Sequence, residues 1–283
     1  MIKYIMLIDT HAHLNFAAFE KDRDEVLRRC LDNNVLTINV GTKYETSERA
    51  VELAQKYKEG VFAAVGLHPI HLETGLVKIK NDTEEIEIKT TEQDFDYQKY
   101  KELAQNSKVV AIGEIGLDYY WKPKTKGRLE VFKQKQKETL LKQLELAREL
   151  NLPLILHCRM AHNDLIQILT LQATRYTLHG VVHCFTGSWE QAQKFLEMGF
   201  YLGFNGIIFK KIAAINFEEV IKNTPLERIL LETDCPYLTP PQAAGRNEPL
   251  NIKYVAQEVA KIKNLSYEEI SRATTENAKK LFK

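Results

Sequence analysis

The sequence predicts an α/β protein that folds as a single (β/α)8 barrel of the TIM type, and three observations support this prediction. Short apolar runs of strand length alternate with segments in which apolar residues recur at helical spacing. There are eight such runs, which is the number of strands that a closed barrel requires. Histidines and acids follow several of these runs, and barrel enzymes assemble their sites at the carboxyl ends of the strands.

Strands and helices are expected in regular order along the chain. The eight strands are expected at residues 4–8, 35–40, 61–65, 109–113, 154–156, 180–182, 201–204 and 229–231. Most of these runs are apolar throughout, which is typical of parallel strands that are covered on both faces. The helices between them are expected at residues 20–34, 46–58, 100–105, 128–150, 164–173, 189–198 and 217–222.

Two more helices are expected after the last strand. One covers residues 252–263, and the other starts at Ser266. Ser266 and Glu269 have the spacing of a capping box, in which each side chain accepts a hydrogen bond from the other residue's backbone N–H.

One stretch interrupts this alternation after the third strand. Residues 76–98 contain two alternating segments around residues 81–84, which indicates a small inserted hairpin. An open doubly wound sheet is the alternative architecture, although no Gly-x-Gly-x-x-Gly motif follows a predicted strand. We expect residues 1–283 to form one domain, because a chain of this length can bury a sizeable core.

The composition is that of a globular protein, with 44% hydrophobic and 27% charged residues. The formal net charge of +1 gives no strongly basic field, although local patches and bound metal ions can still attract phosphates. No apolar run is long enough to cross a membrane, and nothing that resembles a signal peptide precedes Asp9. We expect a cytoplasmic protein with no membrane association and no obligatory protein partner.

The four cysteines, which include Cys158, Cys184 and Cys235, form no Cys-x-x-Cys pair and are expected to be reduced. These three each follow a candidate metal ligand directly. Consecutive strand residues point to opposite faces, so each thiol is expected to face away from the metal of its neighbour.

The most informative stretch is Asp-Thr-His-Ala-His at residues 9–13. In extended geometry the rings of His11 and His13 project to the same side, where two imidazoles can share a cation. Asp9 could orient one of these rings from behind.

Residues of the same chemical types follow other predicted strands. The full set at this end of the strands is His11, His13, His68, Glu114, His157, His183 and Asp234, which includes five of the chain's eight histidines. Each of them alone has an ordinary packing role as its alternative. Together they would be electrostatically unfavourable unless cations held them, so the sequence predicts a metal centre.

Seven motifs occur in order along the chain. They are Asp-Thr-His-Ala-His at 9–13, Gly-Leu-His-Pro at 66–69, Gly-Glu-Ile-Gly-Leu-Asp-Tyr-Tyr at 113–120, Leu-His-Cys-Arg at 156–159, His-Cys-Phe-Thr-Gly-Ser at 183–188, Glu-Thr-Asp-Cys-Pro-Tyr-Leu at 232–238 and Arg-Asn-Glu-Pro at 246–249. With these motifs the chain resembles the TatD family of metal-dependent deoxyribonucleases, within the amidohydrolase-like barrels. Two features depart from the family pattern: the insert at 76–98 is longer, and residues 206–209 lack a threonine that is often present there.

The resemblance implies a centre of two divalent metal ions, with Mg, Mn or Zn as the candidates. His11 and His13 would hold one ion with Asp234. His157 and His183 would hold the second, and Glu114 would bridge the pair. Imidazole and carboxylate ligands suit all of these ions.

The reaction that the resemblance implies is phosphodiester hydrolysis by a metal-activated water, with DNA as substrate and an exonuclease attack on single-stranded ends. Glu114 and Asp234 would be the catalytic residues, with Asp234 also accepting the proton of the attacking water. His68 would contact the substrate, and Asp9 would support the metal ligands.

Positive and aromatic residues near the mouth of the barrel could bind the nucleic acid. Arg159 and Arg246 are expected to contact phosphates. The basic residues Lys122, Lys124, Lys126 and Arg128 could do the same or could form a solvated loop. The aromatic residues at 119–121 could stack on an unpaired base, with buried packing as the alternative.

Two other functions remain open at this level. One is a barrel hydrolase that attacks an ester or amide, for example an aminoacyl-tRNA ester; such barrels often bridge their metals with a carboxylated lysine, whereas Glu114 occupies the matching strand end here. The other is a non-catalytic module that binds nucleic acid or protein on the same fold.

Overall fold

Eight parallel strands form one sheet in chain order, so each strand pairs with its neighbours in the sequence. The computed structural model describes residues 5–72, 94–174 and 176–283. The strands are β1 (Leu7–Ala12), β2 (Val35–Val40), β3 (Val61–Val65), β4 (Val109–Asp118), β5 (Leu154–Arg159), β6 (Gly180–Val182), β7 (Tyr201–Phe204) and β8 (Ile229–Leu231).

The two edge strands of this sheet, β1 and β8, come together and nearly close it into a barrel. Ala12 forms a parallel bridge with Cys235, just beyond the end of β8. The hydroxyl of Thr10 donates a hydrogen bond to the carbonyl of Leu231 at 3.1 Å. The predicted (β/α)8 barrel is confirmed, and the open doubly wound sheet is excluded because its strands would not pair in chain order.

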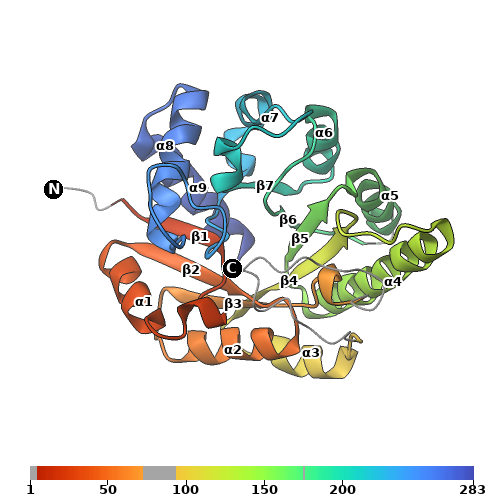
Figure 1. Cartoon of the computed structure of the whole chain (residues 1–283). Helices are drawn as coiled ribbons and strands as arrows, with labels where there is room; N and C mark the ends of the chain where they lie inside the picture. The colour runs from red at the N-terminus through yellow and green to blue at the C-terminus, as the bar shows by residue number, and fades with distance from the viewer. Residues whose placement is uncertain (1–4, 73–93, 175) are drawn as a thin grey trace.

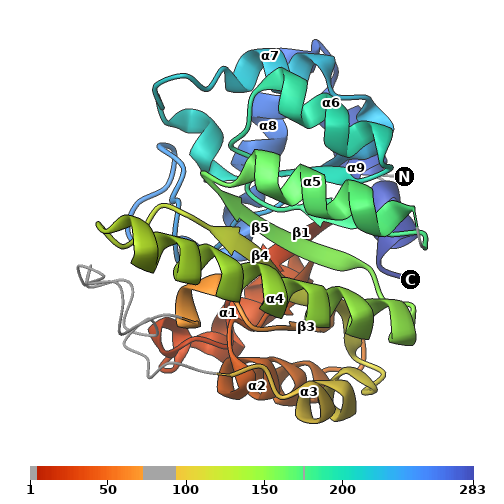
Figure 2. The same cartoon turned by 90° about the vertical axis from the view of Figure 1, so that its right-hand side faces the viewer.

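Helices surround the strands on the outside of the barrel (Figure 1). They are α1 (Arg23–Asp32), α2 (Tyr44–Gln55), α3 (Tyr97–Ala104), α4 (Lys126–Leu150), α5 (His162–Ala173), α6 (Trp189–Glu197), α7 (Phe217–Asn223), α8 (Ile252–Lys263) and α9 (Tyr267–Leu281). Figure 2 shows α4 and α5 lying across β4 and β5.

The helix α9 covers the amino-terminal ends of β1 and β8. Its Thr275 hydroxyl donates to the carbonyl of Met6 at 2.8 Å, and its Asn277 amide donates to the carbonyl of Ile229 at 2.9 Å. Ser266 caps the helix together with Glu269, as the sequence predicts. The site residues lie at the opposite, carboxyl-terminal ends of the strands.

Three strands extend further than the apolar pattern predicts. The strand β1 begins at Leu7 and continues to Ala12, whereas the sequence predicts 4–8. The strands β4 and β5 run on to Asp118 and Arg159, whereas the predicted ends are 113 and 156. Site residues therefore lie within the strands and not only in the loops that follow them.

The predicted hairpin at 76–98 lies largely in residues 73–93, which fall outside the described residues. Within the described ranges, no helix is long and apolar enough to cross a membrane.

Candidate metal centre

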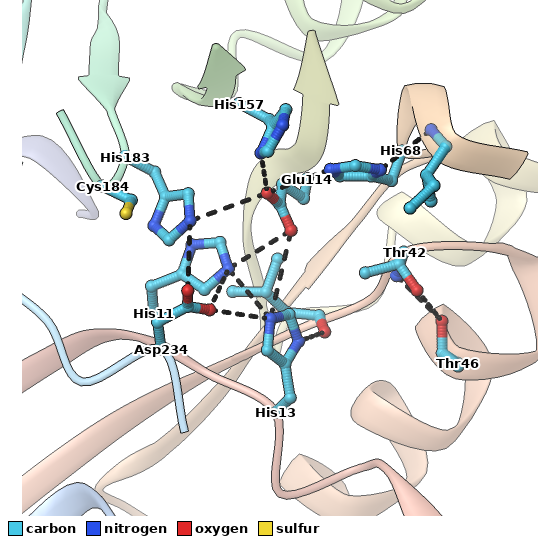
Figure 3. A network of polar contacts seen from close by, with 12 residues as sticks. His11, His13, Thr42, Thr46, His68, Glu114, His157, His183, Cys184 and Asp234 are labelled. Carbon is cyan, nitrogen blue, oxygen red and sulfur yellow. Dashed lines mark hydrogen bonds and ion pairs between the residues drawn. The ribbon is translucent and has the colours of Figure 1, made fainter. Parts of the chain in front are cut away.

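A pocket of about 680 Å³ opens at the carboxyl-terminal ends of the strands. Six of the seven residues predicted for the metal centre and its surroundings line it: His13, His68, Glu114, His157, His183 and Asp234. The seventh, His11, is fully buried and lies against this group (Figure 3). The structure thus brings together side chains that are more than two hundred positions apart in the sequence.

Irregular strand pairing occurs beside two of these residues. The pairing register of β1 with β2 shifts between Asp9 and Ala12, where His11 lies. The register of β4 with β5 shifts between Ile112 and Ile115, where Glu114 lies. Such bulges rotate the local backbone and redirect a side chain, so they help to aim both residues at the pocket.

The first cluster of possible ligand atoms comes from His11, His13 and Asp234, which lie within 4.8 Å of one another. His13 donates its Nδ1–H to the carbonyl of Val40 at 2.8 Å, which leaves its Nε2 lone pair facing the pocket. The Nε2 atoms of His11 and His13 are 3.2 Å apart. Burial lowers the pKa of His11 to about 4, so this ring is neutral near pH 7 and can bind a metal.

The second cluster is formed by Glu114, His157 and His183. Glu114 also joins it to the first cluster, because its two oxygens face in different directions (Figure 3). Its Oε1 lies 2.8 Å from Nδ1 of His157 and 3.6 Å from Nε2 of His183, whereas its Oε2 lies 3.4 Å from Nε2 of His11. Burial opposes the charge of Glu114, but the surrounding histidines hold its pKa well below the usual range.

This donor set fits divalent cations. Two ring nitrogens face each other across 3.2 Å, and buried carboxylates lie on both sides of them. Lone pairs and negative charges at such distances repel one another unless a proton or a cation lies between them. Imidazole and carboxylate are ligands that Zn, Mn and Mg accept.

Two carboxylates that hold the second cluster were not assigned a role from the sequence. Asp118 Oδ2 accepts a hydrogen bond from Nε2 of His157 at 3.1 Å, and Glu232 Oε2 accepts one from Nδ1 of His183 at 2.9 Å. Burial disfavours the charged form of both rings, but these hydrogen bonds and the nearby acids raise the pKa of His157 to about 9 and of His183 to about 10. Both acids occur in the motifs quoted above, which was the available signal.

Asp9 contacts the backbone beside the ligands and not their rings. Its Oδ1 accepts from the N–H of Thr233 at 2.9 Å and from the N–H of His11 at 3.3 Å, and its Oδ2 accepts from the Thr233 hydroxyl. Asp9 is completely buried, which raises its pKa to about 8. Its hydrogen bonds therefore hold the end of β1, next to His11, against the segment after β8, next to Asp234.

His68 has a hydrogen-bond arrangement that differs from that of the other histidines in the pocket. Its Nδ1 accepts from the N–H of Ile70 at 3.0 Å, so the neutral ring carries its proton on Nε2. That Nε2 lies 3.5 Å from Oε1 of Glu114. With neither nitrogen free to bind a metal, His68 is suited to donate a hydrogen bond.

The two arginines that are expected to contact phosphates have different surroundings in the structure. Arg159 lines the pocket, with its guanidinium 3.6 Å from the centre of the Tyr120 ring. Arg246 does not line it; its guanidinium binds Asp22 at 2.6 Å and Glu248 at 3.1 Å. These two acids offset the charge of Arg246, and its contact with a phosphate stays a prediction. The basic residues Lys122, Lys124, Lys126 and Arg128 are exposed and lie outside the lining.

The expectation for the cysteines is wrong at Cys184. The strand β6 ends at Val182, and Cys184 has a φ of 45°, so the alternation of strand side chains no longer applies to it. Its thiol lies within 4.8 Å of ligand atoms of His183 and Asp234. Burial raises the pKa of this thiol well above its usual range, which disfavours the thiolate that a metal would need.

An eight-stranded barrel with histidines and carboxylates gathered at the carboxyl ends of its strands defines the class of metal-dependent barrel hydrolases. Residues 8–283 match the family model described as TatD related DNase. The chain therefore belongs to the TatD family, and it is a metal-dependent hydrolase of that family. The predicted resemblance is confirmed.

Two curated relatives and one solved structure illustrate the similarity. The chain is 42% identical to the uncharacterized metal-dependent hydrolase YabD of Bacillus subtilis strain 168, over 98% of this chain and 99% of that protein. It is 31% identical to the 3′-5′ ssDNA/RNA exonuclease TatD of Pantoea ananatis, again over 98% and 99%. The crystal structure of YjjV, a TatD homologue from Escherichia coli K12, has a TM-score of 0.80 and 32% identity, and covers 99% of this chain and 98% of its own.

Proposed function

We propose that residues 1–283 act as one hydrolase domain that removes nucleotides from single-stranded ends of DNA, with two divalent cations at the barrel mouth. The observation that carries this proposal is the position of Glu114, whose two oxygens face two separate histidine clusters. A relative that is 31% identical over 98% of the chain is named as a 3′-5′ ssDNA/RNA exonuclease, which supports a nucleic-acid substrate.

The proposed ligands follow the two clusters. His11, His13 and Asp234 would hold one cation, His157 and His183 would hold the other, and Glu114 would contact both. The ions are Mg, Mn or Zn. When bound, a pair of such ions supplies Lewis-acid stabilisation of the reacting phosphate oxygens and makes water more acidic.

Asp234 acts as the proton acceptor for the attacking water. It lines the pocket with its side chain 15% exposed, so a water molecule can reach its oxygens. Burial raises the pKa of Asp234, but the charge of His183 and the hydrogen bond from His13 outweigh it, so the pKa is lowered. The carboxylate is thus ionised near pH 7 and can accept a proton.

Other residues hold the substrate and the ligands. His68 donates its Nε2–H to a phosphate oxygen, and Arg159 attracts the phosphate backbone. Tyr120 and Trp121 also line the pocket and offer rings on which an unpaired base can stack. Asp9 supports the ligands through the backbone of His11 and Thr233.

The proposal is tested with end-labelled single-stranded DNA. The protein is treated with EDTA, and its activity is measured before and after Mg, Mn or Zn is added back. Parallel assays use an amide, a simple ester and an aminoacyl-tRNA. We expect labelled nucleotides to be released only with added cation; hydrolysis of an ester or amide without cleavage of DNA would contradict the proposal, as would DNA cleavage in EDTA.

A further inference from the structure

A run of basic side chains follows β4, outside the pocket. It comprises Lys122, Lys124, Lys126 and Arg128, and we call residues 122–128 the basic segment. It contains no acid, and all four basic side chains are exposed. None of them forms an ion pair within the described ranges of the chain. The fold therefore leaves these four positive charges free to meet a partner.

The basic segment begins where the wall of the pocket ends. Tyr120 and Trp121 line the pocket, and Lys122 follows them directly in the chain. The Tyr120 side chain is 45% exposed, and its ring meets the ring of Trp121 edge to face, with the centroids 5.0 Å apart. Figure 2 shows the chain leading from β4 to the start of α4. Two aromatic rings of the pocket wall are thus joined to the four charges.

Hydrogen bonds and packing hold this part of the chain in place. The N–H of Tyr120 donates to Oδ1 of Asp118 at 2.8 Å, and the side-chain amide of Gln136 binds the backbone N–H and carbonyl of Asp118 at 2.8 and 2.9 Å. Pro123 is buried, and the guanidinium of Arg159 lies 3.6 Å from the centre of the Tyr120 ring. A surface that is already ordered loses little entropy when it binds a ligand.

Two of the four charges lie where they weaken their own helix. Lys126 is the first residue of α4, Arg128 is the third, and the first turn of this helix has no acid. The amino-terminal end of a helix carries partial positive charge, so cations are unfavourable there and anions are favourable. The helix terminus and the two side chains therefore attract an anion to the same place.

We propose that the basic segment is the surface over which a single-stranded nucleic acid leaves the pocket. Its phosphates lie on the four cations, and its bases stack on Tyr120 and Trp121 at the pocket wall. A positive surface beside aromatic rings binds single strands without sequence preference, because every base has a face that can stack. The rings favour this partner over an acidic protein surface, which has no bases. The inference rests on the proposed function, because the end of the strand must enter the pocket.

A second path out of the pocket offers fewer charges. Lys210 lines the pocket, and Lys211 follows it; both are exposed. Two cations release fewer counterions from a strand than four do, so binding there is weaker. The strand therefore passes over the basic segment.

The test compares a short and a long substrate on one variant. Lys122→Gln, Lys124→Gln, Lys126→Gln and Arg128→Gln are combined, and kcat and KM are measured on a dinucleotide and on single-stranded DNA of about 16 nucleotides. At low salt KM for the long strand should rise at least about 10-fold, and the slope of log affinity against log salt should fall by about 3, because each phosphate contact contributes about 0.7. The kcat on the long strand and both constants on the dinucleotide, which is too short to reach the basic segment, should stay unchanged.

The matched control removes the same number of positive charges elsewhere. It combines Lys261→Gln, Lys279→Gln, Lys280→Gln and Lys283→Gln, all at exposed positions on α8 and α9 or just after α9. This variant should keep the KM and the salt slope of the wild type. Equal changes in the two variants would show an effect of net charge alone and overturn the inference. So would an unchanged KM for the long strand when the basic segment is substituted, or a larger rise in KM from Lys210→Gln combined with Lys211→Gln.

The stability of the variant shows whether the basic segment has a structural role instead. The melting temperature should not fall, because the loss of Lys126 and Arg128 removes repulsion at the start of α4. Lys122→Gln with Lys124→Gln, both before the helix, repeats the comparison if the fourfold variant does not fold. If the wild type cleaves neither substrate, the proposed function is contradicted; fluorescence anisotropy of the long strand with the EDTA-treated proteins then still tests the basic segment, and equal affinity of wild type and variant would overturn the inference.

Discussion

Asp9 of β1 holds Thr233 of the segment after β8, and the two residues are 224 positions apart in the sequence. The Thr233 N–H lies 2.9 Å from Oδ1 of Asp9, and the Thr233 hydroxyl donates to Oδ2. The contact spans the point where the first and last strands meet. It thus joins the closure of the barrel to the positions of His11 and Asp234, which flank it.

The first prediction follows from this contact. Asp9→Ala leaves the Thr233 N–H and hydroxyl buried without their acceptor, so we expect the free energy of unfolding to fall by about 3 kcal/mol. Urea unfolding of the metal-free protein measures the change. Asp32→Ala is the control, because Asp32 is exposed on α1 and its loss should change little. Similar losses in the two variants would argue against a structural role for the Asp9 contact.

The second prediction concerns Glu114. Glu114→Ala removes the carboxylate between the two histidine clusters, and we expect nuclease activity to fall more than about 100-fold, since even residues behind a ligand commonly contribute 10- to 100-fold. Steady-state rates on single-stranded DNA measure the effect, and circular dichroism should show an intact barrel. Glu130→Ala, at an exposed position of α4, should keep full activity. If the Glu114→Ala protein kept full activity and still bound two cations, the proposed bridging role of Glu114 would be wrong.

The third prediction separates the two arginines. Arg159→Ala should raise KM for single-stranded DNA several-fold and reduce the slope of log affinity against log salt by about 1, because one phosphate contact is lost. Arg246→Ala should leave KM and that slope unchanged and lower the free energy of unfolding by about 1 kcal/mol, because its partners are Asp22 and Glu248. Binding assays at several salt concentrations measure the slopes. The reverse pattern would assign the phosphate contact to Arg246, as the sequence predicts.

The strands could be predicted from the sequence where the apolar run is the whole strand. The expected ranges 35–40, 61–65, 180–182, 201–204 and 229–231 coincide with β2, β3, β6, β7 and β8. The remaining strands continue into polar residues such as Asp9, Glu114 and His157, which interrupt the hydrophobic pattern but stay in the strand. The hydrophobic pattern therefore fails to predict where a strand ends when polar site residues form its last part.

That the candidate ligands gather at one end of the barrel could be predicted, because each comes after a recognisable apolar run, but their hydrogen-bond partners could not. Asp118 binds a ring 39 positions away, and Glu232 binds one 49 positions away. Such pairs depend on strand register, on the bulges in β1 and β4 and on side-chain rotamers, none of which a single sequence reveals. For the same reason the sequence does not reveal the ion pair of Arg246, whose acidic partner Asp22 is 224 positions away.

The last prediction concerns pH in the metal-free protein. Burial favours the neutral ring of His157, but hydrogen bonds to Asp118 and Glu114 outweigh it and raise the pKa from 6.5 to about 9. The folded protein then binds more protons than the unfolded chain between these values. The stability that His157 contributes is therefore complete below pH 6.5 and is lost as pH rises through 9.

Urea unfolding of the EDTA-treated wild type and of His157→Gln, at pH 6, 7.5 and 9, tests this sign. The difference in free energy of unfolding should shrink as pH rises. His11→Gln, measured from pH 6.5 down to pH 4, provides a comparison of opposite sign: burial lowers the pKa of His11 to about 4, so the stability from its neutral ring is present above pH 6.5 and is lost as pH falls through 4. A His157 difference that stays constant or grows between pH 6 and 9 would mean that the two carboxylates do not hold this ring in its charged form.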